Sequence, residues 1–245
     1  MISVKEMRRI IVQAAHHAKH GHIPSALSLV EILKAYSEVQ QKEDEIILSK
    51  GHGCLALYAM LHLRGHIPLD EVLNFGKYNV KLGGHPDRNK LDQIYASTGS
   101  LGHGLPIAVG AAMARKIQNK KGNIFCIVGD GEANEGSIWE SLLIAVSNKL
   151  NNLIVIIDYN KSQIRSLEPN LNTKMFKSFG CDVALVDGHD VEQLIDSMSV
   201  VDKPKVVLAN TVKGKGVKEI EDNMFAWHHR APTDEEYEKF IEVIG

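Results

Sequence analysis

From residue 123 onward, the chain alternates short apolar segments with longer amphipathic ones. The apolar segments have the length and composition of buried strands, and they cover residues 123–128, 152–158, 181–186 and 204–209. The amphipathic segments carry apolar residues at helical spacing, and they cover residues 137–150, 173–179 and 190–199. This order predicts an α/β fold with a mostly parallel sheet, helices on both faces and right-handed crossovers.

The N-terminal part of the chain continues this pattern. The predicted elements there are a helix over residues 3–20, a loop at 21–25, a helix over 25–39, a strand at 45–48 and a helix after 49–53. Ser3 with Glu6, and Thr233 with Glu236, are capping-box pairs that mark the starts of the first and last helices. Because no linker-like or repeated segment interrupts the chain, we expect residues 1–245 to form a single domain.

The composition excludes several classes of partner. A net charge of −2 leaves no basic excess for a nucleic acid or a membrane surface. The longest aliphatic stretch, residues 153–157, is too short to span a bilayer, and the charged N-terminus is unlike a signal peptide, so we expect a cytoplasmic protein. Cys54, Cys126 and Cys181 are odd in number and lie among apolar residues, which predicts buried thiols rather than disulfides or a metal site.

Two polar residues follow neighbouring apolar segments and point to a metal site. Asp130 lies between Gly129 and Gly131, one residue beyond a predicted strand, and Asn160 lies beyond the next one. A right-handed crossover places consecutive parallel strands side by side, so both side chains should meet at the carboxyl edge of the sheet. Hard oxygen donors with room for ligand phosphates favour Mg²⁺ bound to a phosphorylated cofactor. A Gly-Asp-Gly tripeptide taken alone would indicate only a turn.

Several motifs in a fixed order show a family resemblance. They are LSKGHGCLALYAML at 48–61, ASTGSLGHGLPIAVGAAMA at 96–114, GDGEANEGSIWE at 129–140, DYNKSQ at 158–163, VDGHD at 186–190 and KGKGVKEIEDNMFAWHH at 213–229. Together they resemble the N-terminal, diphosphate-binding half of thiamine diphosphate enzymes of the transketolase type. The resemblance covers almost the whole chain and implies the thiamine diphosphate-binding fold.

The resemblance also implies two cofactors, thiamine diphosphate and Mg²⁺. The metal would be bound by Asp130, by the Asn160 side chain and by the backbone carbonyl of Ser162. The residues that would line the cofactor are His52, Gly99, Ser100, Leu101, Gly129, Asp130, Gly131, Glu132 and Asn160. The glycine-rich segment 96–104 has an independent explanation, because a turn that enters a helix aims backbone N–H groups at an anion or packs against the sheet.

Four loop histidines match catalytic positions of the family, and they are His22, His52, His85 and His228. An imidazole titrates near neutral pH, so it can accept and donate the protons that ketose cleavage and aldose addition require. Two departures are present: the proline after His22 is shifted by one place, and His229 replaces a small residue after His228. His103 replaces a glutamine, and we expect it to cap the glycine-rich turn.

Two acids at the start of the helix after Asp130, Glu135 and Glu140, suit the positive end of a helix dipole. In the family, equivalent carboxylates act at a dimer interface and connect to the partner glutamate that activates the aminopyrimidine. We expect a split enzyme in which a separately encoded, pyrimidine-binding subunit completes the site, in an α₂β₂ assembly. The activity implied is transfer of a two-carbon ketol unit from a ketose to an aldose.

Two alternative functions remain open at this point. The α chain of a 2-oxo acid dehydrogenase also pairs Gly-Asp-Gly with an asparagine, although the histidine motifs and the KGKGV segment favour a transketolase. A regulatory subunit that binds a diphosphate without catalysis is the third hypothesis, and the presence of Asp130, Asn160, His52 and His85 argues against it. The sequence does not identify the donor and acceptor sugars.

Overall fold

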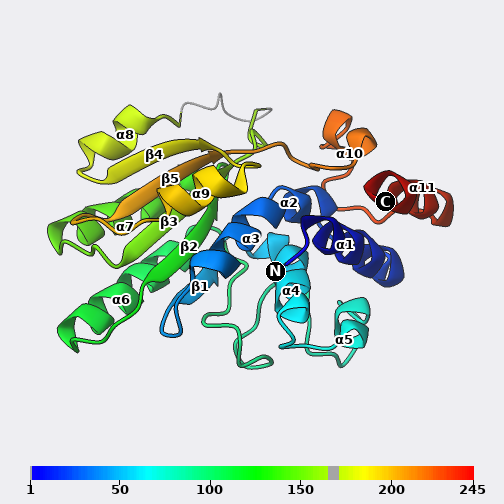
Figure 1. Ribbon diagram of the computed structural model, residues 1–245, viewed down its shortest axis with the longest axis horizontal. Coiled ribbons are helices and arrows are strands. Elements are labelled where there is room, and N and C mark those ends of the chain that lie inside the picture. The colour runs from blue at the N-terminus through cyan, green and yellow to red at the C-terminus, as the bar shows by residue number, and fades with distance from the viewer. Residues whose placement is uncertain (1, 165–170) are drawn as a thin grey trace.

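A parallel sheet forms the centre of the molecule in the computed structural model, which describes residues 2–164 and 171–245 (Figure 1). The described residues form one sheet of five strands in the order β1-β2-β3-β5-β4, and every pair of neighbours is parallel. The strands are β1 Glu45–Leu48, β2 Ile124–Gly129, β3 Leu153–Tyr159, β4 Asp182–Asp187 and β5 Lys205–Asn210. The predicted α/β class and parallel sheet are therefore confirmed, and residues 165–170 of the predicted loop after β3 lie outside the described residues.

Helices cover both faces of this sheet. The longer ones are α1 Val4–Ala18, α3 Val30–Val39, α4 Cys54–Leu63, α6 Gly104–Ile117, α7 Gly136–Ser147 and α11 Asp234–Ile244. The shorter ones are α2 Ile23–Leu27, α5 Leu69–Leu73, α8 Thr173–Ser178, α9 Val191–Ser197 and α10 Lys218–Asp222, with single 3-10 turns at η1 Gly51–Gly53 and η2 Glu132–Asn134.

Two hydrophobic cores follow from the alternation of side chains along the strands. On β2, Phe125 and Ile127 enter the core shared with α1–α4 and α9, whereas Cys126 and Val128 enter the core shared with α6, α7 and α8. A strand that is buried on both faces needs apolar residues at consecutive positions, which explains the unbroken apolar runs in the sequence. Figure 1 shows the two groups of helices on either side of the sheet.

The helix predicted over residues 25–39 is wrong as a single element. Helical backbone begins earlier, at Ile23, because Pro24 occupies the first turn, where its missing N–H costs nothing. The chain then leaves the helix at Ser28 and Leu29, and α3 begins at Val30. The Ser28 hydroxyl bonds to the Asp158 carboxylate at 2.7 Å, a contact across 130 residues that no periodicity in the sequence predicts.

The predicted helix caps are confirmed to different degrees. At α11, Thr233 and Glu236 form a complete capping box. At α1, the Ser3 hydroxyl accepts from the Glu6 backbone N–H at 3.3 Å, while the Glu6 carboxylate lies 3.7 Å from Arg9. The first helix therefore has half of its predicted capping box.

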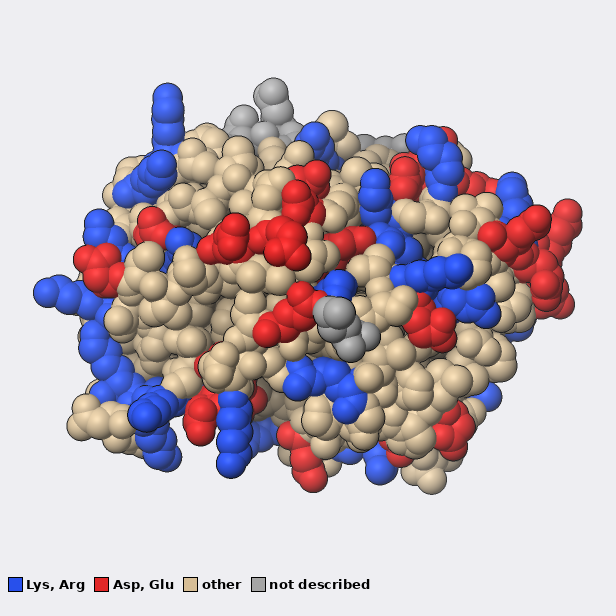
Figure 2. All heavy atoms as spheres, viewed as in Figure 1, with Lys and Arg blue, Asp and Glu red and all other residues tan. Residues whose placement is uncertain are grey.

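The predictions drawn from composition have mixed outcomes. Cys54, Cys126 and Cys181 are free and buried, as predicted. Figure 2 shows acidic and basic side chains interspersed on the face it presents, in keeping with the small net charge. Among residues 2–164 and 171–245, no helix is both long and apolar enough to cross a membrane. The cytoplasmic location stays a prediction.

Parallel pairing brings polar residues to one edge of the sheet. Gly129 of β2 lies opposite Asp158 of β3, and Tyr159 of β3 lies opposite Asn210 of β5. The residues that follow these strands therefore leave the sheet at the same edge. This placement confirms that β2 and β3 are neighbours, which was the premise for bringing Asp130 close to Asn160.

The close contact between α6 and the segment after β1 is testable at one glycine. A Cβ on Gly104 would overlap the backbone and side chain of Ser49, whereas a Cβ on Gly110 of the same helix would meet open space. We expect Gly104→Ala to lower the free energy of unfolding by about 1–3 kcal/mol through overpacking. Gly110→Ala, the matched control, should raise it by about 0.5–1 kcal/mol, because alanine favours a helix. Urea denaturation measures both, and equal effects would contradict the packing described.

Candidate active site

A cavity of about 380 Å³ lies at the carboxyl edge of the sheet. Its walls come from the segments that follow β1, β2, β3 and β5 and from three further loops. The lining residues are His22, Lys50, His52, His85, Gly99, Leu101, Gly129, Asp130, Gly131, Glu132, Asn160, Ser162, Lys213 and His228. Most of the residues predicted from separate motifs therefore meet in one cavity.

Asp130 is buried in this cavity with half of its carboxylate unsatisfied. Its Oδ1 accepts hydrogen bonds from the Gly131 N–H and the Ser162 hydroxyl, both at 2.8 Å. Its Oδ2 is buried and has no hydrogen-bond partner among the described residues. Burial raises the pKa of Asp130, although the hydrogen bond from Ser162 opposes the rise. A buried carboxylate oxygen without a donor is costly unless a cation occupies its lone pairs.

Asn160 lies beside Asp130 with its two amide atoms in different surroundings. Its Oδ1 accepts from the Ser162 N–H at 3.0 Å, and its Nδ2 donates to the Asp158 carboxylate at 3.0 Å. Ser162 thus contacts both predicted ligands, through its hydroxyl and through its backbone N–H. The structure brings together the three residues predicted for the metal.

This donor set fits Mg²⁺. Carboxylate, amide and backbone oxygens are hard donors, and Mg²⁺ commonly takes one or two protein carboxylates and completes its shell with phosphate and water. Within residues 2–164 and 171–245, no cluster of three or more His, Cys, Asp or Glu side chains forms a cage for a metal ion. The site therefore suits an ion that arrives with an anionic ligand, and the unsatisfied oxygen of Asp130 is the observation that supports this.

Glu132 lines the cavity, and both of its carboxylate oxygens already accept hydrogen bonds. Its carboxylate accepts from the Gly102 N–H at 2.9 Å, from the Gly129 N–H at 3.1 Å and from the Ser49 hydroxyl. These bonds join the glycine-rich turn, the end of β2 and the segment after β1. Burial raises the pKa of Glu132, and the bond from Ser49 is the largest opposing effect. Glu132 therefore stabilises the predicted cofactor-binding turn by hydrogen bonding to it.

Three of the predicted histidines are close to each other. The ring of His22 lies 5.3 Å from the rings of both His52 and His228, measured between centroids. Burial, helped by the charges of His229 and His228, lowers the pKa of His22 to about 4. Burial and then the charge of Lys50 lower the pKa of His52 to about 2. Burial and then Lys213 lower the pKa of His228. All three rings are therefore neutral at pH 7.

His85 reaches the cavity on a loop that α4 holds in place. The Tyr58 hydroxyl bonds to the backbone carbonyls of Gly83 and His85, at 3.0 and 3.1 Å, and the Cys54 thiol bonds to the carbonyl of Gly84 at 3.2 Å. The His85 ring packs against Gly99, where a Cβ would lie within 3.2 Å of it. Gly99 has a φ of +154°, which favours glycine.

The sequence reasoning missed two lysines in the cavity. Lys50, 1% exposed, forms an ion pair with the fully buried Asp158. Lys213 lies 3.3 Å from Nδ1 of His228, and burial followed by the charge of Lys50 lowers the pKa of Lys213 to about 8. Both lysines stand in motifs that were singled out for other residues, SKGHG and KGKGV, and a lysine beside glycines usually indicates a solvated turn. Only the structure shows that they are buried.

The remaining predicted residues lie outside the cavity lining. Glu135 and Glu140 are exposed at the start of α7, and Ser100 is exposed on the glycine-rich turn. His103 is exposed, and its Nδ1 lies 3.0 Å from the Leu101 carbonyl, which agrees with a role in the turn. Of the two tail histidines, His228 lines the cavity, and the His229 ring lies 4.5 Å from that of His22.

Comparisons with known proteins point in one direction. Residues 2–242 match the family described as the transketolase thiamine diphosphate binding domain. The chain is 37% identical to one subunit of the apulose-4-phosphate transketolase of Actinobacillus succinogenes, over 97% of this chain and 92% of that protein. It is 32% identical to the 6-deoxy-6-sulfo-D-fructose transketolase subunit SqwG of a Clostridium species, over 94% of this chain and 90% of that protein.

A solved structure agrees in fold. The crystal structure of a transketolase from Campylobacter jejuni superimposes with a TM-score of 0.90 at 30% identity. The superposition covers 100% of this chain and 43% of that one, so the chain spans less than half of that transketolase.

The lowered pKa of His52 makes a prediction for acid stability. The unfolded state takes up a proton near pH 6.5 and the folded state does not until about pH 2, so acidification below 6.5 favours unfolding. The contribution is about 1.4 kcal/mol for each pH unit. We expect His52→Gln to make the fall of unfolding free energy between pH 6 and pH 4.5 shallower by that amount. His17→Gln, on the exposed side of α1, should keep the wild-type slope. Denaturant unfolding across this pH range measures the unfolding free energy of both variants. If it fell as steeply with acidification in His52→Gln as in the wild type, the lowered pKa of His52 would be contradicted.

Proposed function

The chain belongs to the transketolase thiamine diphosphate binding domain family, and from this premise we propose that it is the N-terminal subunit of a split transketolase. With a separately encoded pyrimidine-binding subunit, it transfers a two-carbon ketol unit from a ketose to an aldose acceptor. The support comes from two relatives named as transketolase subunits, which the chain matches over 92% and 90% of their own lengths. Residues 1–245 then correspond to one domain.

The cavity accounts for the two cofactors in this proposal. Asp130, Asn160 and Ser162 hold Mg²⁺, and the unsatisfied Oδ2 of Asp130 is the observation that carries the assignment. Lys213 adds positive charge to the same cavity, which suits a diphosphate, whereas Asp158 balances the charge of Lys50. Thiamine diphosphate, when bound, supplies a thiazolium carbon that becomes the nucleophile.

The histidines handle protons in this proposal. His22, His52 and His228 are neutral because burial lowers the pKa of each. The neutral rings of His22 and His52 each keep one unprotonated nitrogen that can accept a proton from a sugar hydroxyl. The Lys213 ammonium donates to Nδ1 of His228, so the neutral His228 ring carries its proton on Nε2 and can donate a hydrogen bond to the sugar. His85 lines the same cavity and packs against Gly99. The four residues thus line the space that a sugar would enter.

An exposed apolar surface beside the cavity suits the partner subunit. Leu101 at the cavity mouth, Ile107 on α6, and Leu143 and Ile144 on α7 are between 38% and 52% exposed. Glu135 and Glu140 begin the same α7, so the predicted interface acids lie next to apolar side chains that a partner would bury. We place the pyrimidine-binding subunit here and expect an α₂β₂ assembly.

The alternative of a 2-oxo acid dehydrogenase α chain is disfavoured, since the family match and the relatives reported above are all transketolases. The hypothesis of a subunit without catalysis is separated from the proposed function by the activity measurement below.

The metal assignment predicts a loss of ligand-induced stability. With Mg²⁺ and thiamine diphosphate at about 100 times their dissociation constants, the wild-type complex should gain about 2.7 kcal/mol in unfolding free energy. Asp130→Ala should abolish this gain while the unliganded protein stays folded, since it removes a buried carboxylate oxygen that has no donor among the described residues. Thermal unfolding with and without ligands measures the gain. An Asp130→Ala protein with the full gain would mean that the ion is bound elsewhere.

The split-enzyme assignment predicts activity only with the partner. The chain co-purified with the product of a neighbouring gene should transfer a ketol unit in the presence of thiamine diphosphate and Mg²⁺. The chain alone should be inactive, because the group that activates the aminopyrimidine belongs to the partner. A coupled assay for the aldose released from the donor measures this. Activity of the isolated chain would contradict the need for a partner, and a complex that binds both cofactors without activity would favour a non-catalytic subunit.

A further inference from the structure

Asp158 is the centre of a hydrogen-bond network beneath the candidate metal site. It is fully buried near the end of β3, and its carboxylate contacts four side chains from four separate segments. The Lys50 ammonium and the Thr211 hydroxyl bond to it, the Ser28 hydroxyl lies 2.7 Å away, and Nδ2 of Asn160 lies 3.0 Å away. These contacts connect the residues after β1, β3 and β5 with the junction between α2 and α3.

The chemistry of a carboxylate decides how Asn160 is oriented. An ionised carboxylate only accepts hydrogen bonds, so the amide atom of Asn160 that faces Asp158 has to be the NH₂ group. The carbonyl oxygen Oδ1 then points away from Asp158, toward the Ser162 N–H, on the side of the proposed metal ligands. If Asp158 did not accept this bond, the amide would be free to turn its NH₂ group toward a cation.

We propose that Asp158 is a positioning residue that selects which amide atom of Asn160 faces the metal. The inference rests on the proposed function, because it assumes Mg²⁺ at Asp130, Asn160 and Ser162. It also explains why residue 160 is an asparagine. One side chain has to donate to Asp158 and offer an oxygen to the ion, and an amide meets both demands while a carboxylate does not.

Substitution of Asn160, alone and together with Asp158, tests this proposal. By charge alone, Asn160→Asp would strengthen a cation site. The proposal predicts the reverse, because the new carboxylate at position 160 would lose the donated bond and stand beside the carboxylate of Asp158. The measurement uses Mn²⁺ as a paramagnetic substitute for Mg²⁺, in the complex with the partner subunit and with saturating thiamine diphosphate. The EPR signal of free Mn²⁺ gives the dissociation constant. We expect Asn160→Asp to raise this dissociation constant at least tenfold.

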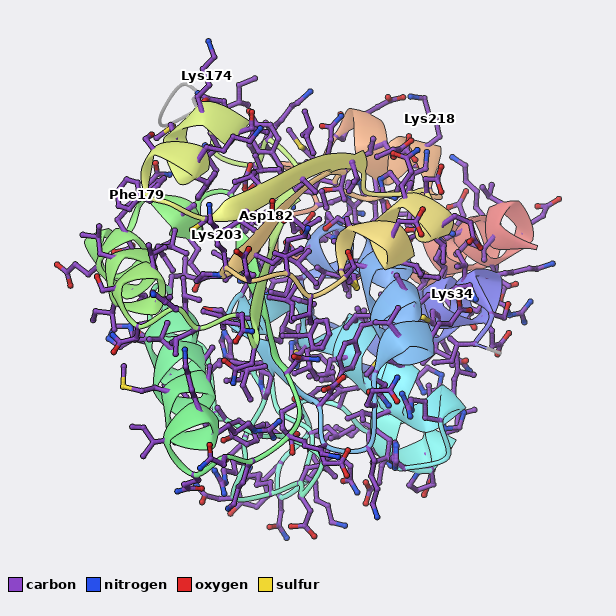
Figure 3. All side chains as sticks on the ribbon, turned by 60° about the vertical axis from the view of Figure 1, so that its left-hand side comes forward. Lys34, Lys174, Phe179, Asp182, Lys203 and Lys218 are labelled. Atoms are coloured by element: carbon purple, nitrogen blue, oxygen red, sulfur yellow. The ribbon has the colours of Figure 1, made fainter. Side chains whose placement is uncertain are left out.

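The double variant Asp158→Asn with Asn160→Asp restores one donor and one acceptor in reversed positions. We expect it to bind Mn²⁺ at least fivefold more tightly than Asn160→Asp alone. Asp182→Asn is the matched control, since Asp182 lies at the amino end of β4 (Figure 3). Its carboxylate pairs with Lys205 and not with the residues of the cavity. Asp182→Asn should change the dissociation constant less than twofold.

Thr211→Val is a milder substitution that tests the proposal if the other variants fail to fold. It removes one hydrogen bond from Asp158 and alters no charge, and we expect a threefold or greater rise in the dissociation constant. Circular dichroism identifies the folded variants. The proposal is overturned if folded Asn160→Asp binds Mn²⁺ as tightly as wild type, if the double variant folds and binds no better than Asn160→Asp, or, where neither folds, if Thr211→Val leaves affinity unchanged. A wild-type complex that binds no Mn²⁺ with thiamine diphosphate would instead contradict the proposed function.

Discussion

The buried ion pair between Lys50 and Asp158 is the constraint on which the cavity depends. Two charges that are 1% and 0% exposed are costly to remove from water, by several kcal/mol each, unless the geometry compensates. Here hydrogen bonds from Ser28, Thr211 and Asn160 satisfy the carboxylate. Burial by itself would raise the pKa of Asp158, but the charge of Lys50 and the bonds from Lys50, Thr211 and Ser28 hold it below its usual value. The pair thus fixes the relative positions of the segments that build the cavity floor.

Much of the fold could be predicted because strand burial leaves a local trace. All four apolar segments predicted after residue 123 are strands, since residues buried on both faces must be apolar at consecutive positions. The break between α2 and α3 could not be predicted, because it accompanies a hydrogen bond from Ser28 to a residue 130 positions away. The glycine flanks of Asp130 and the place of Asn160 after the next strand were local signals. The burial of Lys50 and Lys213 was not, since it depends on tertiary packing.

Charge in the cavity follows one pattern. Two lysines share a space with three histidines whose pKa values lie below the usual value. Burial disfavours added positive charge on the rings, and the nearby ammonium groups disfavour it further. Lys213 responds in the same way, with its pKa lowered to about 8. The arrangement keeps the histidines neutral and leaves positive charge to the lysines, of which Lys213 has no carboxylate ion-pair partner among the described residues, and this suits an anionic ligand.

The turn after β2 carries two buried carboxylates, Asp130 and Glu132, whose hydrogen-bond surroundings indicate different roles. One suits a metal ligand, and the other stabilises the turn. Glu132 accepts three hydrogen bonds, from Ser49, Gly102 and Gly129, so each of its oxygens has a partner. Asp130, two residues earlier, leaves Oδ2 without a partner among the residues that the structure describes. Sequence reasoning assigned both acids to the cofactor because both stand in the same motif. Their hydrogen bonds distinguish the two acids. Both oxygens of Glu132 accept bonds from the segments that form the turn, whereas Oδ2 of Asp130 is left for the ion.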